Sequence, residues 1–294
     1  MLDPLPGKLM KDCSDTLLPV IVRTVNLSFE EAVVSAKFKQ GALTPKLKKS
    51  SLDNELFPNF RPITNLRFIS KATEKVVAAR LNSYLDDNNL HELLQSAYKQ
   101  GHSTETTLVK VQNDILRSID EHNCVALLLL DLSAAFDTVD HSLLLSRLRR
   151  RFQIDGKALK WLHSYLTNRS QFVCVGNGYS SRRDLLYGVP QGSVLGPILY
   201  LLYTAPLADV IKEHNMSYHF YADDTQIYMS FQPSSCIVTL DEVRSKIEAC
   251  VSDINNWMTD NKLKLNNDKT ELLILHTHHR PSPSLDYVYA DTEL

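Results

Sequence analysis

The sequence contains few cysteines, and they follow no pairing pattern. Its 294 residues include five cysteines, none of which forms a Cys-x-x-Cys pair. Five scattered cysteines are neither the even set of a disulfide-rich secreted domain nor the ligand set of a zinc site. We therefore expect a reducing compartment, thiols that serve as core filler, and no disulfide partner.

A secretory signal and a membrane span are also missing. No apolar stretch follows a basic start at the N-terminus. The apolar segment 194–211 is interrupted by Pro197 and Pro206, which predicts a buried helix and no membrane partner. We expect this helix to be capped by Ser193 and to run to about His214. These absences predict an intracellular protein, cytoplasmic and/or nuclear, that is not secreted.

Charge is balanced overall but is not spread evenly. The net charge is −2, and 22% of the residues are charged. Residues 37–83 hold ten lysines and arginines against three acids, and residues 147–183 hold nine against one. Two basic blocks beside an acidic remainder suit a protein that grips phosphate backbones and presents carboxylates to metals. Solvated helix faces are the alternative interpretation of such blocks.

A β-hairpin is predicted around residue 223. The apolar and aromatic residues 216–220 predict its first strand. From Thr225 to Phe231 apolar residues alternate with polar ones, which predicts the second strand. Asp223 and Asp224 therefore stand at the turn between two strands.

This turn contains no glycine. A tight two-residue turn prefers Asn-Gly or Asp-Gly, whereas this one carries two adjacent acids, Asp223 and Asp224. Two aspartates between strands are often only a polar turn. Carboxylates held close together repel each other, however, and stay ionised only beside a cation. A hard divalent cation such as Mg²⁺ is the natural partner because it takes oxygen ligands.

A third carboxylate follows another predicted strand. Residues 125–130 are all apolar and lead directly to Asp131, which predicts a buried strand too short to cross a membrane. Burying an unpaired carboxylate is costly, so Asp131 should lie at the strand end beside a counter-ion. A strand that simply ends at a solvated aspartate is the alternative. The co-occurrence with Asp223 and Asp224 favours a metal site.

Three stretches in this order resemble a reverse transcriptase. They are Asp-Leu-Ser-Ala-Ala-Phe-Asp at 131–137, Gly-Val-Pro-Gln-Gly-Ser at 188–193, and Tyr-Ala-Asp-Asp at 221–224. The amino-acid sequence around the first two stretches is similar to that of the polymerase of non-LTR (LINE-type) retrotransposons. Tyr-Ala-Asp-Asp alone is a weak signal, whereas the ordered set over nearly the whole chain is a specific one.

The resemblance implies an α+β fold with the fingers and palm of a right-hand polymerase, in which an antiparallel sheet is backed by helices. We expect an N-terminal helical extension at 1–36, fingers at 37–120 and a palm with the catalytic motifs at 121–280. A tail at 281–294 would lead toward a thumb that is absent or truncated, because the resemblance stops where the thumb of the family begins.

The resemblance also implies a two-metal transfer of nucleotides to a primer 3′-hydroxyl. Asp131 and Asp223 would hold two Mg²⁺ ions, for which Mn²⁺ could substitute, and Asp224 would assist. Lys269 matches a family lysine near the leaving pyrophosphate and is the fourth catalytic candidate. A surface lysine in a turn is the alternative for this position.

Further positions match substrate contacts of the family. Arg61, which Pro62 keeps extended, corresponds to an arginine that binds the triphosphate, and Lys48 is a second candidate of this kind. Phe136 stands five residues after Asp131, where a family aromatic lies under the sugar and excludes a 2′-hydroxyl. The remaining candidates are Gln191, which would contact the incoming nucleotide, Gly192, which allows close backbone approach, and Tyr221. Ordinary core packing and an ordinary strand-to-helix turn are the alternatives.

The partners implied by the resemblance are an RNA template, a DNA primer and deoxynucleoside triphosphates. Two other functions stay open on the sequence alone. One is a polymerase relic that binds nucleic acid without synthesis. The other is an RNA-dependent RNA polymerase, against which Phe136 argues.

Overall fold

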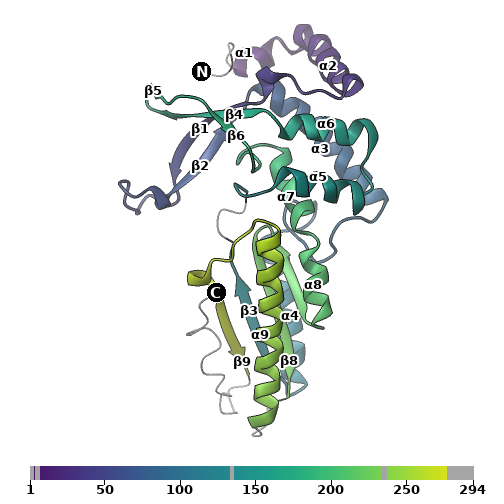
Figure 1. The fold of residues 1–294 in the computed structure, drawn as a ribbon, viewed down its shortest axis with the longest axis vertical. Helices are drawn as coiled ribbons and strands as arrows, with labels where there is room; N and C mark the ends of the chain where they lie inside the picture. The colour runs from purple at the N-terminus through teal and green to yellow at the C-terminus, as the bar shows by residue number, and fades with distance from the viewer. Residues whose placement is uncertain (1–2, 4–6, 133–135, 233–236, 277–294) are drawn as a thin grey trace. The chain divides into compact units, whose positions relative to one another are not determined.

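Two compact units make up the protein. The computed structural model describes Asp3 and residues 7–132, 136–232 and 237–276 (Figure 1). The first unit takes the chain up to Leu90 together with Phe136–Tyr203, and the second takes His91–Ala135 with the chain from Thr204 onward. The units are therefore interleaved along the sequence. The division into fingers and palm at residue 120 stays a prediction, and the expected tail at 281–294 lies outside the described residues.

The first unit contains helices and a mixed sheet. Its α-helices are α1 (Gly7–Asp12), α2 (Ser14–Glu31), α3 (Phe68–Asp87), α5 (His141–Arg150), α6 (Gly156–Leu166) and α7 (Leu195–Thr204), whose last residue belongs to the second unit. Its strands are β1 (Gln40–Leu47), β2 (Phe60–Asn65), β4 (Arg169–Val175), β5 (Gly178–Tyr179) and β6 (Arg183–Leu185), and its 3-10 helices are η1 (Ala36–Phe38) and η2 (Phe57–Asn59). α1 and α2 occupy the stretch before residue 37, as expected from its pattern, and the assignment of residues 1–36 as an extension of the fingers stays a prediction.

The sheet of the first unit follows the order β2-β1-β4-β5, and β6 also pairs with β4. β1 is antiparallel to β2 and parallel to β4. The register sets Lys46 of β1 opposite Arg61 of β2. Arg61 is therefore extended, as the following proline predicts.

Buried side chains from the helices form the core of the first unit. Residues exposed by 1% or less include Leu85 of α3, Leu144 and Leu148 of α5, Tyr165 and Leu166 of α6, and Leu199 and Tyr200 of α7. The two buried leucines of α5 are four residues apart and so share one helix face. Asp140 caps this helix by accepting a hydrogen bond from the Leu143 amide at 2.9 Å.

The second unit is a four-stranded sheet with helices. Its helices are α4 (Thr104–Asp120), α8 (Leu207–Glu213), α9 (Ile237–Asp260) and the 3-10 helix η3 (Asn267–Lys269). Its strands are β3 (Cys124–Leu130), β7 (Ser217–Tyr221), β8 (Asp224–Phe231) and β9 (Glu271–Leu275). The order is β7-β8-β3-β9, and all neighbours are antiparallel. The expected α+β fold with an antiparallel sheet is confirmed.

The apolar character of β3 follows from its central position. It pairs with β8 on one side and β9 on the other, and Cys124, Val125 and Ala126 are at most 1% exposed. Val111 of α4 packs with Val125, Leu127 and Tyr228 in a buried cluster on the sheet. Figure 1 shows α9 running along the length of the strands, and its buried residues recur at helical spacing: Val243, Ile247, Val251, Ile254 and Met258.

The single helix expected between Ser193 and His214 is wrong, because two helices occupy this stretch. Proline lacks an amide hydrogen and clashes with the preceding turn of a helix. α7 accordingly ends at Thr204, and α8 begins at Leu207 after Pro206. Ser193 does act at the start of α7, since its Oγ accepts a hydrogen bond from the Gly196 amide at 2.9 Å.

The described part of the chain has no helix with the length and apolar character needed to cross a membrane. The thiols of Cys13, Cys124, Cys174 and Cys250 are not joined in disulfides, and Cys236 lies outside the described residues.

Candidate active site

The β7–β8 turn presents one of the predicted acids. Tyr221 pairs with Asp224, so Ala222 and Asp223 form the two-residue turn. Asp224 is thus the first residue of β8, whereas the sequence pattern predicts both aspartates in the turn. Ala222 has a φ of 57°, in the left-handed region that costs a non-glycine residue about 1–2 kcal/mol. A turn of this kind needs outside support to hold its shape.

Asp131 lies near Asp224 at one end of the sheet. Asp131 directly follows β3 and Asp224 begins β8, and the last pair that these two strands form is Leu130 with Thr225. Burial and the negative charges of Asp223 and Asp131 raise the pKa of Asp224, and Lys269 opposes them. Three mutually repelling carboxylates therefore gather at one end of this sheet.

Two residues from the segment after α9 hold Asp131. Its Oδ2 accepts hydrogen bonds from Asn266 Nδ2 at 2.9 Å and from the Lys269 ammonium at 3.0 Å. Its backbone carbonyl accepts a hydrogen bond from the Asn266 amide at 2.9 Å. The Lys269 side chain is 65% exposed, so its ion pair with Asp131 contributes at most about 1 kcal/mol. Lys269 therefore joins the acids by binding one of them.

The donor set suits a hard divalent cation. Carboxylate oxygens are the ligands that Mg²⁺ and Mn²⁺ take. A cation would also relieve the repulsion that raises the pKa of Asp224. Among the described residues, no three His, Cys, Asp or Glu side chains already stand in a metal-binding arrangement. Since Lys269 contacts Oδ2 of Asp131, a cation that uses this oxygen has to displace its ammonium.

Two tyrosines flank the acids of the second unit. Tyr221, a predicted substrate contact, is half-buried and pairs with Asp224. Burial and then the charges of Asp223 and Tyr221 raise the pKa of Tyr98. The phenol of Tyr98 therefore lies in the electrostatic field of the turn. Nothing in the sequence had singled out Tyr98 as a site residue.

In the first unit, the Gly-Val-Pro-Gln-Gly-Ser loop is tied to two other segments. The Thr64 amide of β2 donates to the Gln191 carbonyl at 2.7 Å. The Val189 amide donates to the Phe136 carbonyl at 2.8 Å. The loop thereby joins Phe136 and Gln191, which are distant in sequence, to the strand that carries Arg61.

Two glycines allow these close approaches. Gly192 has a φ of 105°, and a Cβ there would lie 2.8 Å from the Thr64 carbonyl oxygen. Gly188 has a φ of 83°, and a Cβ there would lie 2.8 Å from the Asp137 carbonyl oxygen. Any larger residue would have to move the backbone of its neighbour. Gly192 therefore permits close approach to β2, and its contact with a nucleotide stays a prediction.

A cavity of about 400 Å³ lies beside this loop. Its lining includes Pro62, Thr64, Asp137, Asp184 and Gln191. Gln191 Oε1 is buried, and no hydrogen-bond donor reaches it within the described residues. Buried acceptors are normally satisfied, so Gln191 Oε1 is unusual, and its contact with a nucleotide stays a prediction.

Phe136 combines packing with partial exposure. Its ring stacks on the buried Tyr200 of α7, with 4.7 Å between the centroids and 26° between the planes. The residue is nevertheless half-buried. Phe136 therefore packs on α7 while the residue keeps part of its surface exposed, and its contact with the sugar stays a prediction.

The β1–β2 hairpin carries a cluster of exposed cations. Arg61 is exposed and lies opposite Lys46, which is exposed as well. Like charges directly opposite each other in a sheet are destabilising, and an anion between them removes the penalty. Lys48 lies just beyond β1, where its amide donates to the Asn59 carbonyl at 2.9 Å. Lys46 thus joins the two predicted cations, Arg61 and Lys48.

The start of α7 is held by a buried acid. Glu74 of α3 is 1% exposed, and its Oε2 accepts hydrogen bonds from the Val194 amide at 2.6 Å and the Leu195 amide at 3.3 Å. Burial raises the pKa of Glu74, while these amides and the positive charge of Arg169 oppose the shift. Glu74 therefore caps α7 just after the glycine-containing loop.

The residues that support the site were not predicted from the sequence. Asn266 and Glu74 sit in patterns typical of a turn and a helix, and only the fold shows what they contact. Within the second unit the structure gathers Asp131, Tyr221, Asp223, Asp224 and Lys269. Within the first unit it joins Phe136, Gln191 and Gly192 to the strand of Arg61.

Two known proteins are similar to this chain in sequence. A probable RNA-directed DNA polymerase from transposon BS of Drosophila melanogaster is 30% identical over 270 residues, covering 88% of this chain and 29% of that protein. The corresponding protein of transposon X-element from the same organism is 34% identical over 168 residues, covering 56% of this chain and 18% of that protein. The chain thus spans less than a third of these relatives.

A solved structure shares the fold. Apo telomerase from Candida tropicalis, truncated from its C-terminal domain, superposes with a TM-score of 0.56 at 16% identity, over 87% of this chain and 55% of that one. The family model of reverse transcriptase (RNA-dependent DNA polymerase) matches residues 47–288. The chain therefore belongs to the reverse transcriptase family, among the domains found in polymerases of non-LTR transposons.

Proposed function

We propose that this chain is an RNA-directed DNA polymerase that transfers nucleotides to a primer 3′-hydroxyl with Mg²⁺. The main support for this proposal is that Asp131, Asp223 and Asp224 lie together at one end of an antiparallel sheet, where their charges interact. An RNA template, a DNA primer and deoxynucleoside triphosphates are the proposed partners, in keeping with the family.

Asp131 and Asp223 would hold two Mg²⁺ ions, with Asp224 assisting and Mn²⁺ as a substitute. Divalent cations in this position would neutralise negative charge on the triphosphate and would favour ionisation of the primer hydroxyl. Asn266 fixes one oxygen of Asp131 in place. Once its ammonium is released from Asp131, Lys269 is free to donate a proton or a hydrogen bond to the leaving pyrophosphate.

The first unit carries the proposed nucleotide contacts. Arg61 and Lys46 form an exposed cationic pair, suited to phosphate oxygens, and Lys48 extends it. Gln191 would contact the incoming nucleotide, which is supported by its place in the lining of the cavity and by the missing partner of its Oε1. Phe136, which is partly exposed, would lie under the sugar and exclude a 2′-hydroxyl.

In the proposed division, with fingers at 37–120 and a palm at 121–280, the cations of the β1–β2 hairpin lie in the fingers. Phe136 and Gln191 of the first unit lie in the palm, together with the acids of the second unit. The α+β fold and the likeness to telomerase support this division. RNA templates and deoxynucleoside triphosphates are found inside cells. We accordingly propose a cytoplasmic or nuclear location.

Primer extension on an RNA template tests this function. The wild-type chain should extend a DNA primer with deoxynucleotides and Mg²⁺. Asp131→Asn or Asp223→Asn should abolish extension and leave the circular dichroism spectrum unchanged. Extension by either variant at the wild-type rate would overturn the assignment.

Phe136→Val tests the choice of sugar in an assay with separate deoxynucleotide and ribonucleotide pools. This variant should incorporate ribonucleotides. An unchanged ratio of deoxynucleotide to ribonucleotide incorporation would return Phe136 to a packing role.

Nucleic-acid binding without synthesis is the second candidate function. The contact of Lys269 with Asp131 favours it, because the ammonium occupies an oxygen that a divalent cation would use. The same assay separates the two functions. Retained RNA binding with no extension at any Mg²⁺ or Mn²⁺ concentration would favour the binding function.

A further inference from the structure

A short segment between α3 and α4 runs along the outer edge of β7. The Phe220 amide donates to the Leu94 carbonyl at 2.8 Å, and the Ser96 amide donates to the Phe220 carbonyl at 3.1 Å. These two bonds bracket Gln95, which forms a parallel bridge with Phe220. The backbone of Gln95 is therefore fixed relative to the strand that leads to the catalytic turn.

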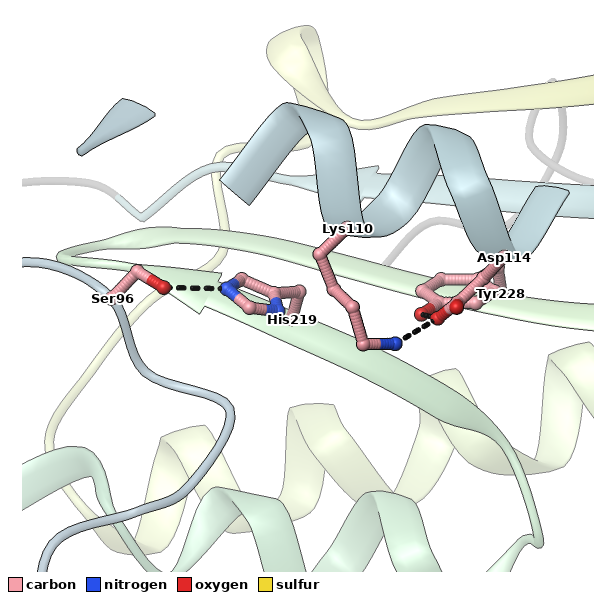
Figure 2. Close-up of polar contacts among 5 residues, drawn as sticks. All are labelled: Ser96, Lys110, Asp114, His219 and Tyr228. Atoms are coloured by element: carbon pink, nitrogen blue, oxygen red, sulfur yellow. Dashed lines mark hydrogen bonds and ion pairs between the residues drawn. The ribbon is translucent and has the colours of Figure 1, made fainter. Parts of the chain in front are cut away.

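Side chains strengthen this attachment on both sides of Gln95. Tyr218 Oη donates to Glu92 Oε1 at 2.8 Å. Ser96 Oγ and His219 Nε2 share a hydrogen bond of 2.9 Å, which Figure 2 shows next to α4. Ser96 and His219 are 3% and 5% exposed, so this contact is buried. The segment is thus attached to β7 at successive residues and cannot shift along it without losing several bonds at once.

The side chain of Gln95 reaches the turn itself. Its Oε1 accepts hydrogen bonds from the Ala97 amide at 2.8 Å and the Ala222 amide at 3.1 Å. Its Nε2 donates to the Ala222 carbonyl at 3.4 Å, a longer and weaker contact. Two amide donors on one oxygen fix the orientation of the carboxamide. Gln95 is 8% exposed, so water competes little for these bonds.

The turn has two reasons to need such a contact. Ala222 is left-handed with a φ of 57°, a conformation for which hairpin turns favour glycine. Asp223 follows it directly and lies among like charges that raise the pKa of Asp224. Repulsion between carboxylates pushes the turn away from the shape that gathers them. A support that binds both polar groups of the Ala222 residue resists this push.

We propose that Gln95 is a positioning residue that holds the Ala222–Asp223 turn, so that the carboxylates are gathered before a divalent cation binds. The proposal rests on the polymerase function proposed above. A carboxamide suits the position because it offers a donor and an acceptor without adding charge. A glutamate would keep the acceptor, lose the donor and place a further negative charge beside the aspartates.

Three variants of the full chain test this role. Gln95→Met keeps the length of the side chain and removes both hydrogen-bonding groups. Gln95→Glu keeps the acceptor alone. Gln100→Met is the matched control, because Gln100 lies in the same loop and is exposed. Hydrogen exchange of the Ala222 amide and Mn²⁺ binding, followed by electron paramagnetic resonance, are measured for each.

Gln95→Met should speed exchange at Ala222 by about tenfold or more and weaken Mn²⁺ binding by about tenfold, the lower range for residues that orient metal ligands. Gln95→Glu should protect Ala222 better than Gln95→Met does, and Gln100→Met should match the wild type. Unchanged exchange and unchanged Mn²⁺ affinity in Gln95→Met would overturn the proposal. If the wild-type chain binds no Mn²⁺, the polymerase function fails, and exchange alone still decides whether Gln95 holds the turn.

Discussion

Each unit holds a segment of the candidate site with one buried polar side chain, which is a carboxamide in the second unit and a carboxyl group in the first. In the second unit Gln95 binds the amide and the carbonyl of Ala222. In the first unit Glu74 binds the amides of Val194 and Leu195. Both are almost fully buried, at 8% and 1% exposure.

The surroundings explain the difference. Burial raises the pKa of Glu74, whereas the amides at the start of α7 and the positive charge of Arg169 oppose this shift and favour the carboxylate. Gln95 acts beside Asp223, where another carboxylate would add to the repulsion. A buried support can therefore carry charge only where the segment it holds supplies the opposite sign. The comparison predicts that removing Glu74 harms stability most, whereas removing Gln95 harms metal binding most.

Glu74→Ala should have the largest effect on stability. It leaves the Val194 and Leu195 amides without their acceptor and removes a counter-charge of the buried Arg169. Losses of this kind cost about 3 kcal/mol or more. Urea unfolding followed by fluorescence measures the loss. Glu74→Gln, which keeps an acceptor oxygen, should lose clearly less, and an equal loss in both variants would contradict the capping role.

Metal affinity should depend on pH through Asp224. Its pKa is raised by burial and by the charges of Asp223 and Asp131, so a proton competes with the cation more strongly than at an ordinary aspartate. Mn²⁺ binding to the wild type should strengthen as pH rises through the weakly acidic range, by up to about tenfold per pH unit. Titrations at a series of pH values check this. Asp224→Asn should flatten the profile, and a profile equally steep in that variant would assign the proton elsewhere.

Lys269→Met should strengthen metal binding but slow DNA synthesis. It removes the ammonium that contacts Oδ2 of Asp131. An exposed ion pair contributes at most about 1 kcal/mol, so Mn²⁺ should bind up to about fivefold more tightly. Primer extension should slow, because the proposed pyrophosphate contact is lost. Lys264→Met, which alters an exposed lysine of the same segment, serves as the control. Weaker Mn²⁺ binding in Lys269→Met would show that Lys269 supports the metal site and does not compete for it.

The smallest effect is expected at His219, which anchors the segment of Gln95. Burial and then the charge of Lys110 lower its pKa, so the folded state keeps the ring neutral. The unfolded state takes up a proton at about pH 6.5, so this contribution to stability is lost as pH falls from there toward the lowered pKa. Thermal unfolding of the wild type at a series of pH values should show this decline in stability. The decline should be only a fraction of the stability lost in Glu74→Ala. His219→Gln should reduce the slope, whereas an unchanged slope would point to other titrating groups.

The acids of the candidate site were predicted from the sequence, but the residues that support them were not. Alternation and apolar runs located the strands around Asp131 and Asp223, because sheet burial imposes those patterns. Gln95 and Asn266 left no pattern, since a hydrogen bond to a distant backbone depends on the fold alone. The end of α7 before Pro206 could have been predicted from the sequence, because the ring of a proline does not fit inside a continuous helix.

The order of the chain has a consequence for synthesis on the ribosome. The first unit is complete only when Tyr203 has been made, yet residues 91–135 of the second unit are made before it. Translation proceeds at about 5–20 residues per second, so the central strand β3 waits several seconds for its partners β8 and β9. During that time its apolar edge has no strand to pair with, and a stalled or prematurely ended chain would expose it to aggregation.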